Sequence, residues 1–198
     1  MVINGNDRWI QLGSTGIWNT NDTGESPWID KFSPPDTTNL RYQSENELLE
    51  LFNKKGTQTC VLNLGGLYGQ DRKPSNFLKK LEDKIQDKGS VHFIHGVDVA
   101  RAIIMLHERF TPGQRWIITN QRVHDWWSIA LDLTLPTDLS RLKVLKLMKI
   151  LKLKAVPRSI TEEISDDPHV SICYLNRALD SSHFWNEFDE GPLSGALT

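Results

Sequence analysis

Short apolar runs and amphipathic stretches alternate along the first two thirds of the chain. The runs have the length of single buried strands, and they cover residues 10–12, 58–64, 90–94 and 115–119. Each run is followed by a stretch with apolar residues at helical spacing. Four strand and helix pairs in succession predict an α/β fold with a mainly parallel sheet.

The boundaries of the helices follow from their capping residues. The first helix is predicted to start after Asp36, a good N-cap that follows two prolines, and to end near Asn53. The others are predicted over residues 76–88, from Asp98 as N-cap to residue 106, and around residues 126–131. Helices in these positions cover the sheet and build a layered domain.

The last third of the chain has a different character. Residues 139–154 are rich in leucine and lysine and lie between Pro136 and Pro157, which predicts a basic amphipathic helix. We expect this helix to pack within a small lobe, and docking on a membrane surface or in the groove of a partner is the alternative. The predicted organisation is an α/β domain over residues 1–135 and a helical lobe with a tail over residues 136–198.

Composition and charge narrow the classes of function. The 198 residues carry a formal net charge of -2, which gives no overall attraction to nucleic acid. No apolar run approaches the ~18 residues of a membrane span, so we expect neither a transmembrane helix nor a signal peptide. The two cysteines, Cys60 and Cys173, are far apart and favour reduced thiols in the cytoplasm. No ligand set surrounds His92 and His95, so no metal site is predicted.

The first strand ends in a loop of the kind that holds ligands. The apolar run at residues 10–12 breaks into the small polar residues Gly13, Ser14, Thr15 and Gly16. Loops at the carboxyl ends of strands are where open α/β sheets place their ligands. Ser14 and Thr15 therefore offer hydroxyl groups at a candidate site.

Four segments carry recognisable motifs in a fixed order. They are the strand and Gly-Ser-Thr-Gly loop at 9–18, the strand and Gly-Gly-Leu-Tyr-Gly loop at 60–72, the Phe-Ile-His-Gly-Val-Asp-Val-Ala run within 91–103, and Asn-Arg-Ala-Leu-Asp-Ser-Ser at 176–182. In this order they resemble the extended short-chain dehydrogenase/reductase family, the NAD(P)-dependent epimerases and dehydratases. The third segment is the most specific of the four.

The resemblance implies both a fold and a set of site residues. The fold implied is the C-terminal portion of a Rossmann-type, three-layer α/β sheet with a small helical substrate lobe. Ser14 takes the position of the family's catalytic serine, and Ser14 and Thr15 would touch substrate or nicotinamide. The cofactor implied is NAD or NADP, with Arg41 near its ribose and the loop residues Gly65, Gly66 and Leu67 at the nicotinamide face. A plain link from strand to turn is the alternative for this loop.

Two departures from the family pattern bear on its chemistry. The Gly-x-x-Gly-x-x-Gly loop that receives the pyrophosphate is absent from the sequence, so binding of the cofactor by this chain alone is in doubt. No Tyr-x-x-x-Lys pair exists either. With Glu45 aligned on the family's helix glutamate, Thr37 and Arg41 stand at the tyrosine and lysine positions, and Tyr42 could replace the tyrosine by a shift in register. A threonine hydroxyl is a far poorer acid or base than a phenol.

These features predict a truncated or atypical member of the epimerase/dehydratase family. Oxidoreductase or epimerase activity is expected only if a glycine-rich half completes the fold, and the substrate is left open. The alternative is a non-catalytic binding or regulatory module that reuses the scaffold. His95 is interpreted as a scaffold residue. Without further strands beside it, the strand at residues 10–12 is an edge that favours self-association.

Overall fold

The computed structural model describes residues 8–18, 28–55, 57–74, 76–77, 90–126, 129 and 178–193. Most of the helix predicted over 76–88, most of the helix around 126–131, the lysine-rich helix over 139–154 and Cys173 lie outside these residues. The chain divides into two compact units. Unit 1 comprises Met1–Leu67, His92–Arg122 and Leu179–Thr198, and unit 2 comprises Tyr68–Val91 and Val123–Ala178. The predicted boundary at residue 135 is likewise outside the described residues and stays a prediction.

A parallel sheet forms the centre of unit 1 and confirms the predicted α/β architecture. Its strands are β1 (Arg8–Ser14), β3 (Gln58–Leu64) and β7 (Gln114–Ile118), in the order β1-β3-β7. Both neighbouring pairs are parallel. Apolar runs without alternation are typical of parallel strands that are covered on both faces, and every residue of β3 after Gln58 is buried.

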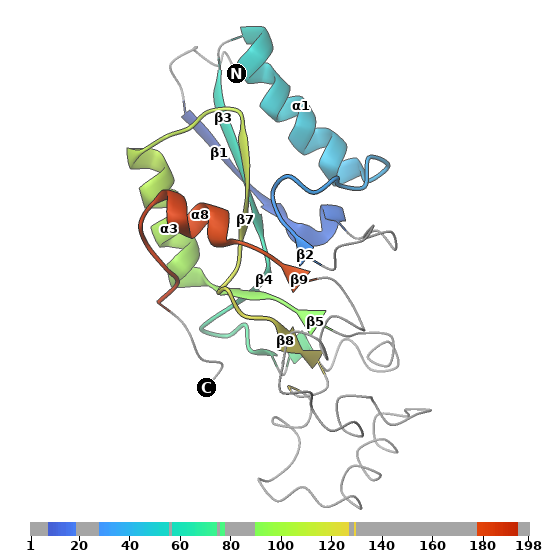
Figure 1. Ribbon diagram of the computed structural model, residues 1–198, viewed down its shortest axis with the longest axis vertical. Coiled ribbons are helices and arrows are strands. Elements are labelled where there is room, and N and C mark those ends of the chain that lie inside the picture. Colours follow the sequence, from blue (N-terminus) through green and yellow to red (C-terminus); the bar gives the residue numbers. More distant parts are fainter. Residues whose placement is uncertain are drawn as a thin grey trace, which may run out of the picture. The chain divides into compact units, whose positions relative to one another are not determined.

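Helices lie on both faces of this sheet (Figure 1). The helix α1 (Leu40–Lys55) covers one face, and α3 (Gly96–Glu108) and α8 (Ser182–Glu187) cover the other. Alternate residues of β3 and β7 build the core under α3 and α8, which includes Cys60, Leu62, Leu64, Trp116, Ile118, Phe184 and Trp185. The three-layer arrangement is the predicted one.

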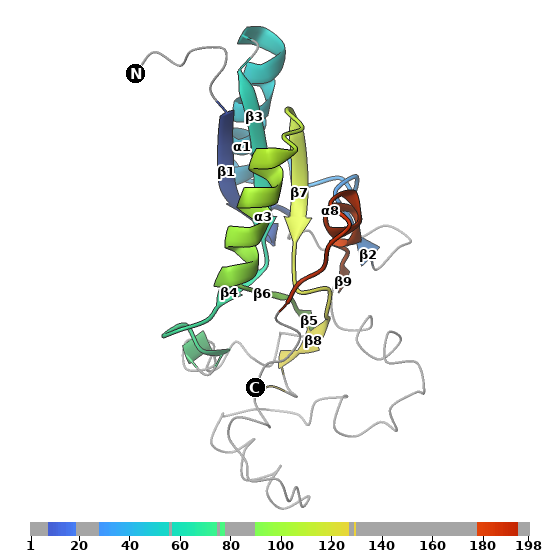
Figure 2. The same cartoon turned by 90° about the vertical axis from the view of Figure 1, so that its left-hand side faces the viewer.

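The prediction that the first strand is buried was wrong. Strand β1 lies at the edge of the sheet and pairs with β3 (Figure 2). Two of its apolar side chains face solvent, Trp9 with 36% and Leu12 with 45% of its surface exposed. The apolar run therefore located the strand, and the edge position agrees with the sequence-based expectation, but the burial of its side chains does not.

The strand predicted at residues 90–94 is two short strands. β5 (Ser90–Val91) pairs with β8 (His124–Asp125), and both lie in unit 2. β6 (Phe93–His95) pairs instead with β4 (Gly66–Tyr68). A further pair joins β2 (Trp28–Ile29) to β9 (Ala178–Leu179). The segment 178–193, which the sequence placed in the C-terminal lobe, thus contributes β9 and α8 to the layers around the sheet.

Both predicted N-caps were wrong by a few residues. Helix α1 begins at Leu40, and Asn39 caps it because its Oδ1 accepts hydrogen bonds from the backbone N–H groups of Arg41 (3.0 Å) and Tyr42 (3.4 Å). Asp36 closes a separate turn by accepting from the N–H of Thr38 (2.9 Å). Local turns of this kind compete with capping, so the helix starts at the next suitable residue.

At α3 the capping residue is His95. Its Nδ1 accepts from the N–H of Val97 at 3.2 Å. Asp98 is the third helical residue and is fully buried, where its Oδ1 accepts from the guanidinium of Arg101 (3.1 Å) and the N–H of Leu193 (2.9 Å). The capping hydrogen bond of His95 is consistent with its interpretation as a scaffold residue.

The described cysteine has no reactive character. Cys60 is a free thiol buried in the core, and its Sγ–H donates to the carbonyl of Gln114 at 3.1 Å. Burial raises the pKa of the thiol to about 12. Among the described residues, no helix is long and apolar enough to cross a membrane.

Candidate functional site

The parallel sheet brings two of the predicted site segments together at the carboxyl ends of its strands. Ser14, Leu64 and Ile118 are the last residues of β1, β3 and β7, and they lie side by side in the register. The turns that follow these strands therefore start from the same side of the sheet. The loops of Ser14–Thr15 and Gly65–Leu67, which the sequence placed at a site, are neighbours in the structure.

The two hydroxyl groups after β1 have different positions. The Thr15 hydroxyl donates to the carbonyl of Leu64 (3.3 Å) and so ties the turn to β3. The Ser14 hydroxyl accepts from the N–H of Gly16 (3.2 Å). In the described part of the chain, the Ser14 hydroxyl donates no hydrogen bond. Of the two, Ser14 is the one whose hydroxyl can donate a hydrogen bond to a ligand at the carboxyl ends of the strands.

The glycines after β3 are required by nearby backbone and side-chain atoms of the chain itself. The N–H of Gly66 donates to the carbonyl of His92 at 2.7 Å. A Cβ at Gly65 would lie 2.9 Å from that same oxygen, and a Cβ at Gly66 would lie 3.0 Å from the Phe93 ring. The close approach that calls for glycine is therefore to His92 and Phe93 of the same chain, as the link from strand to turn predicts.

This close approach predicts a difference between two glycines. Gly65→Ala should lower the free energy of unfolding by about 1–3 kcal/mol, because the obstructing atom is a backbone oxygen. Gly96→Ala is the matched control, since its Cβ would meet nothing within 4 Å at the first residue of α3. Urea unfolding followed by circular dichroism measures both changes. Equal stability of the two variants would contradict the steric explanation.

The residues at the family's tyrosine and lysine positions do not share a helix. Thr37 is exposed in the turn before α1, where its carbonyl accepts from the Gln43 side chain (3.1 Å). Arg41 is exposed in the first turn of the helix. Two residues four apart face each other only when both are helical. Tyr42 packs under the Arg115 guanidinium, which is 4.8 Å from the centre of its ring.

The start of α1 nevertheless lies beside the loop after β1. The N–H of Asp36 donates to the carbonyl of Ile17 (2.8 Å). The side chain of Asn39 donates to the carbonyl of Gly16 (3.5 Å). The predicted positions on α1 and at Ser14 thus belong to one region of unit 1.

A buried polar cluster under α1 was not recognised from the sequence as a functional feature. Glu45 and Asn63 are 4% and 0% exposed, and Glu45 Oε2 accepts from Asn63 Nδ2 at 2.8 Å. The same oxygen lies 3.7 Å from Arg115 Nη2. Burial lowers the pKa of Arg115, and the nearby Glu45 and Tyr42 act in the opposite direction. Two features of the sequence could have indicated this cluster: an asparagine within an apolar strand and a glutamate at an inward helical position.

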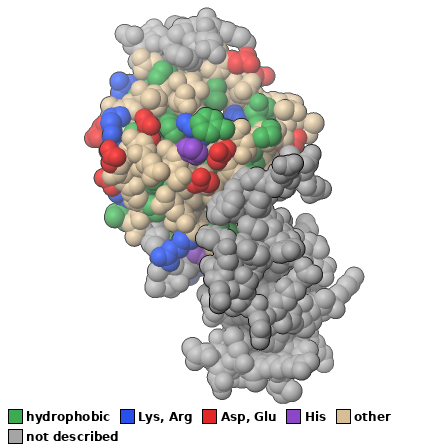
Figure 3. Space-filling view, in the orientation of Figure 1, with side chains coloured by type: hydrophobic (Ala, Val, Ile, Leu, Met, Phe, Trp, Pro, Cys, Tyr) green, Lys and Arg blue, Asp and Glu red, His purple; other side chains and the backbone are tan. Residues whose placement is uncertain are grey.

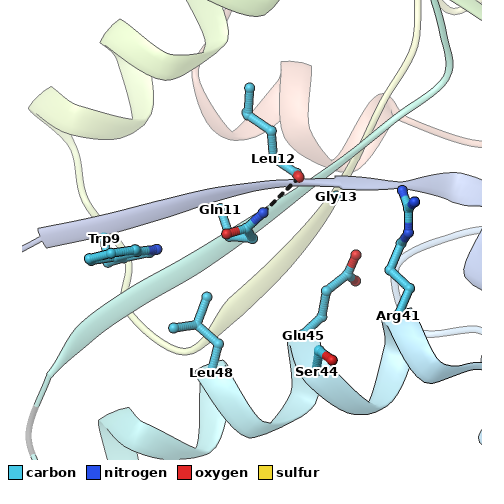
Figure 4. Close-up of a pocket in the computed structure, with 8 residues that line it drawn as sticks. All are labelled: Trp9, Gln11, Leu12, Gly13, Arg41, Ser44, Glu45 and Leu48. Carbon is cyan, nitrogen blue, oxygen red and sulfur yellow. Dashed lines mark hydrogen bonds between the residues drawn. The ribbon is translucent and has the colours of Figure 1, made fainter.

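A pocket of about 490 Å³ adjoins this cluster (Figure 4). Strand β1 and helix α1 form its walls, and it is lined by Trp9, Gln11, Leu12, Gly13, Arg41, Ser44, Glu45 and Leu48. Trp9 and Arg41 lie toward opposite ends of the row of labelled side chains (Figure 4). The Oε1 atom of Glu45 is buried without a hydrogen-bond partner. Buried carboxylate oxygens normally accept hydrogen bonds, so this wall of the pocket is polar and contains an acceptor that is not hydrogen-bonded.

The described residues do not provide a pyrophosphate site. The α-helices α1, α3 and α8 follow Asn39, His95 and Ser181, and a short 3-10 helix (Thr15–Trp18) follows Ser14. None of these four described helices is preceded by Gly-x-x-Gly-x-x-Gly. The described part also contains no group of three metal-ligating side chains. On the face shown in Figure 3, acidic and basic side chains are interspersed rather than gathered by sign.

No model of a protein family and no curated protein matches the sequence. Solved structures match its fold. dTDP-glucose 4,6-dehydratase of Bacillus anthracis in complex with NAD has a TM-score of 0.59 at 12% identity, over 94% of this chain and 56% of that one. The dTDP-glucose 4,6-dehydratase of Streptomyces venezuelae, with NAD and TYD bound, has a TM-score of 0.58 at 14% identity, over 93% and 55%.

A nucleoside-diphosphate-sugar epimerase of Pseudomonas aeruginosa is similar to the same extent. Its TM-score is 0.57 at 12% identity, over 96% of this chain and 62% of that one. The chain therefore has the fold of these dehydratases and epimerases and spans a little over half of their length. The fold implied by the sequence motifs is confirmed.

Proposed function

We propose that the chain is an atypical member of the NAD(P)-dependent epimerase/dehydratase family whose catalysis requires a glycine-rich segment outside these 198 residues. The observation that carries the proposal is the position of Ser14. It ends the edge strand of a parallel sheet, beside the start of α1, in a fold shared with NAD-bound dehydratases.

The proposed roles follow from this position. Ser14 donates a hydrogen bond to substrate or nicotinamide, and Arg41 supplies a positive charge near the ribose. Thr15 holds the turn in place, and Gly65, Gly66 and Leu67 border the nicotinamide. The cofactor is NAD or NADP, since similar structures contain NAD or NADPH. Thr37 replaces the phenol of the usual proton relay, so proton transfer is slow or uses a group of the substrate.

Two further points belong to the same proposal. The segment over residues 136–198 includes the substrate lobe, which holds a small molecule of unknown identity. The protein acts in the cytoplasm, which the two widely separated cysteines and the buried free thiol of Cys60 support.

A non-catalytic binding module is the second candidate function. It is favoured by the exposed position of Thr37 ahead of α1 and by the packing of Gly65 and Gly66 against His92 and Phe93 of the chain itself. Such a module has the same sheet but no catalytic activity. It predicts that no extension of the chain restores turnover.

The encoding reading frame and a cofactor titration test the two candidates. We expect the genomic frame upstream of residue 1 to encode a strand followed by Gly-x-x-Gly-x-x-Gly, and the longer chain to bind NADH or NADPH at micromolar concentration by calorimetry. The 198-residue chain should bind neither, because it has no phosphate loop. Ser14→Ala in the longer chain should reduce turnover about 100-fold. Absence of the upstream segment, with no binding by a well-folded chain, would support the binding module instead.

A further inference from the structure

We propose that Asn63 is a positioning residue for Ser14, and that two buried charged side chains hold its amide in place. The first observation is a pair of hydrogen bonds from one nitrogen. Asn63 Nδ2 donates to the Ser14 carbonyl at 3.2 Å and to Glu45 Oε2 at 2.8 Å. The amide therefore joins the residue that carries the proposed hydroxyl to the interior under α1. The importance of this contact for catalysis rests on the proposed function.

Glu45 and Arg115 complete the series of contacts. Glu45 extends from α1 toward β1 beside Gly13 (Figure 4), and its Oε2 atom lies 3.7 Å from Arg115 Nη2. The two side chains are 5% and 11% exposed. Side chains that are packed in an interior stay in one low-energy rotamer. The acceptor that holds the Asn63 amide therefore has a fixed position.

The backbone around Ser14 is restrained on both sides. Before it, Gly13 lies against Asn63, because a Cβ at Gly13 would be 2.5 Å from Asn63 Nδ2. After it, the Thr15 hydroxyl donates to the carbonyl of Leu64 (3.3 Å). The backbone has only two soft torsions per residue, so restraints on both neighbours and on the Ser14 carbonyl also fix the direction of its Cα–Cβ bond. Through this carbonyl, Asn63 determines where the Ser14 hydroxyl lies.

An asparagine at this position does not favour stability. Every residue of β3 after Gln58 is buried, and Asn63 has no exposed surface. Among the described residues, its Oδ1 atom has no hydrogen-bond partner. A buried acceptor without a partner destabilises the fold, and an apolar side chain of the same size would avoid that loss. Residues that break a rule of packing in this way are typical of functional sites.

The carbonyl signal of Ser14 tests the contact directly. Ser14 and Thr15 are the only Ser-Thr pair in the sequence, so ¹³C-carbonyl serine and ¹⁵N-threonine labels give one cross-peak in an HNCO spectrum. In the 198-residue chain, Asn63→Leu should shift this signal upfield, because the carbonyl loses its donor. Glu45→Ala should shift it in the same direction. Glu45→Gln should leave it at the parent position, since the glutamine oxygen still accepts from the amide.

Two substitutions on the same strand serve as controls. Thr59→Val lies on the same face of β3 as Asn63 and removes a buried hydroxyl that has no partner in the described part of the chain. Leu62→Ala lowers stability on the opposite face. Both should leave the signal unchanged. An unshifted signal in Asn63→Leu, or an equal shift in Leu62→Ala, would overturn the proposal. If Asn63→Leu does not fold, the comparison of Glu45→Ala with Glu45→Gln decides in its place.

Turnover tests the consequence for the site. In the longer chain of the proposed function, Asn63→Leu should lower kcat about 10-fold and leave the KM of the cofactor unchanged, because Ser14 is displaced while the cofactor contacts remain. In a Ser14→Ala background the same substitution should lower kcat less than about twofold, since there is no hydroxyl left to position. Equal losses in both backgrounds would show an effect on the fold alone and would overturn the positioning role.

The positioning role and the proposed function can fail separately. The cross-peak experiment needs neither cofactor nor turnover. A longer chain without turnover would contradict the proposed function, and the Ser14 signal would still decide whether Asn63 holds its carbonyl. Turnover that depends on Ser14 but not on Asn63 would contradict the positioning role alone.

Discussion

Glu45→Ala should lower the free energy of unfolding by about 3–5 kcal/mol. The side chain is almost fully buried and is the charged partner of Arg115, whose side chain is 11% exposed. Removing one member of such a pair leaves the other charge buried without compensation. Asn63 loses its acceptor at 2.8 Å as well. Urea unfolding followed by tryptophan fluorescence, at one protein concentration, measures the loss.

Two comparisons isolate the charge pair. Glu47 lies on the exposed side of the same helix, so Glu47→Ala should change the free energy of unfolding by less than about 0.5 kcal/mol. The double variant Glu45→Leu with Arg115→Met removes both charges and should be more stable than the sum of the single changes predicts. If Glu45→Ala unfolds at the same urea concentration as the parent, the cluster contributes nothing to the fold.

Gly13→Ala should lower the free energy of unfolding by about 2–3 kcal/mol. The added Cβ would lie 2.5 Å from Asn63 Nδ2 and in contact with Glu45 Oε1. Neither group can move freely, because the two side chains are hydrogen-bonded to each other in the interior. Overpacking of a well-filled site costs this much when its neighbours cannot relax. Thermal and urea unfolding provide the measurement.

Rescue distinguishes this clash from a general effect of alanine in a strand. In the Glu45→Ala background the same substitution should cost less than about 1 kcal/mol, because the obstructing carboxylate is gone and Asn63, freed from its hydrogen bond to Glu45, can move away from the added Cβ. Gly16→Ala is the control, since its Cβ would come no closer than 3.4 Å to Ser14 Oγ. An unchanged cost of Gly13→Ala in both backgrounds would place its cause outside the cluster.

Local patterns predicted most of the secondary structure. The strand predicted at residues 58–64 is β3 with the same bounds, and the strand predicted at 115–119 is β7, one residue earlier. The pattern succeeds because a buried strand needs consecutive apolar residues, whichever elements surround it. Helix starts were less predictable. Asn39 and His95 displaced Asp36 and Asp98 as caps, because several neighbouring side chains compete for the same backbone N–H groups.

The site could be located in part. Ser14 and Thr15 were placed at the end of the first strand, and the structure has them there beside the turn after β3. For Gly65 and Gly66 the sequence left a ligand and a plain link from strand to turn open, and the atoms of the chain that crowd them belong to His92 and Phe93. A glycine in a sequence shows that something approaches closely. It does not show whether a ligand or the chain itself does so.

The sequence by itself determined the alternation of the main strands and helices, the parallel sheet, and the absence of Tyr-x-x-x-Lys and Gly-x-x-Gly-x-x-Gly from these 198 residues. Each of these depends on residues near one another in the chain. The tertiary structure alone decided that Trp9 and Leu12 of β1 are exposed and that Glu45, Asn63 and Arg115 meet under α1. These three residues come from a helix and two strands that are far apart in the sequence. Their contact arises from the crossover of the chain over the sheet, which no local pattern of hydrophobic and polar residues encodes.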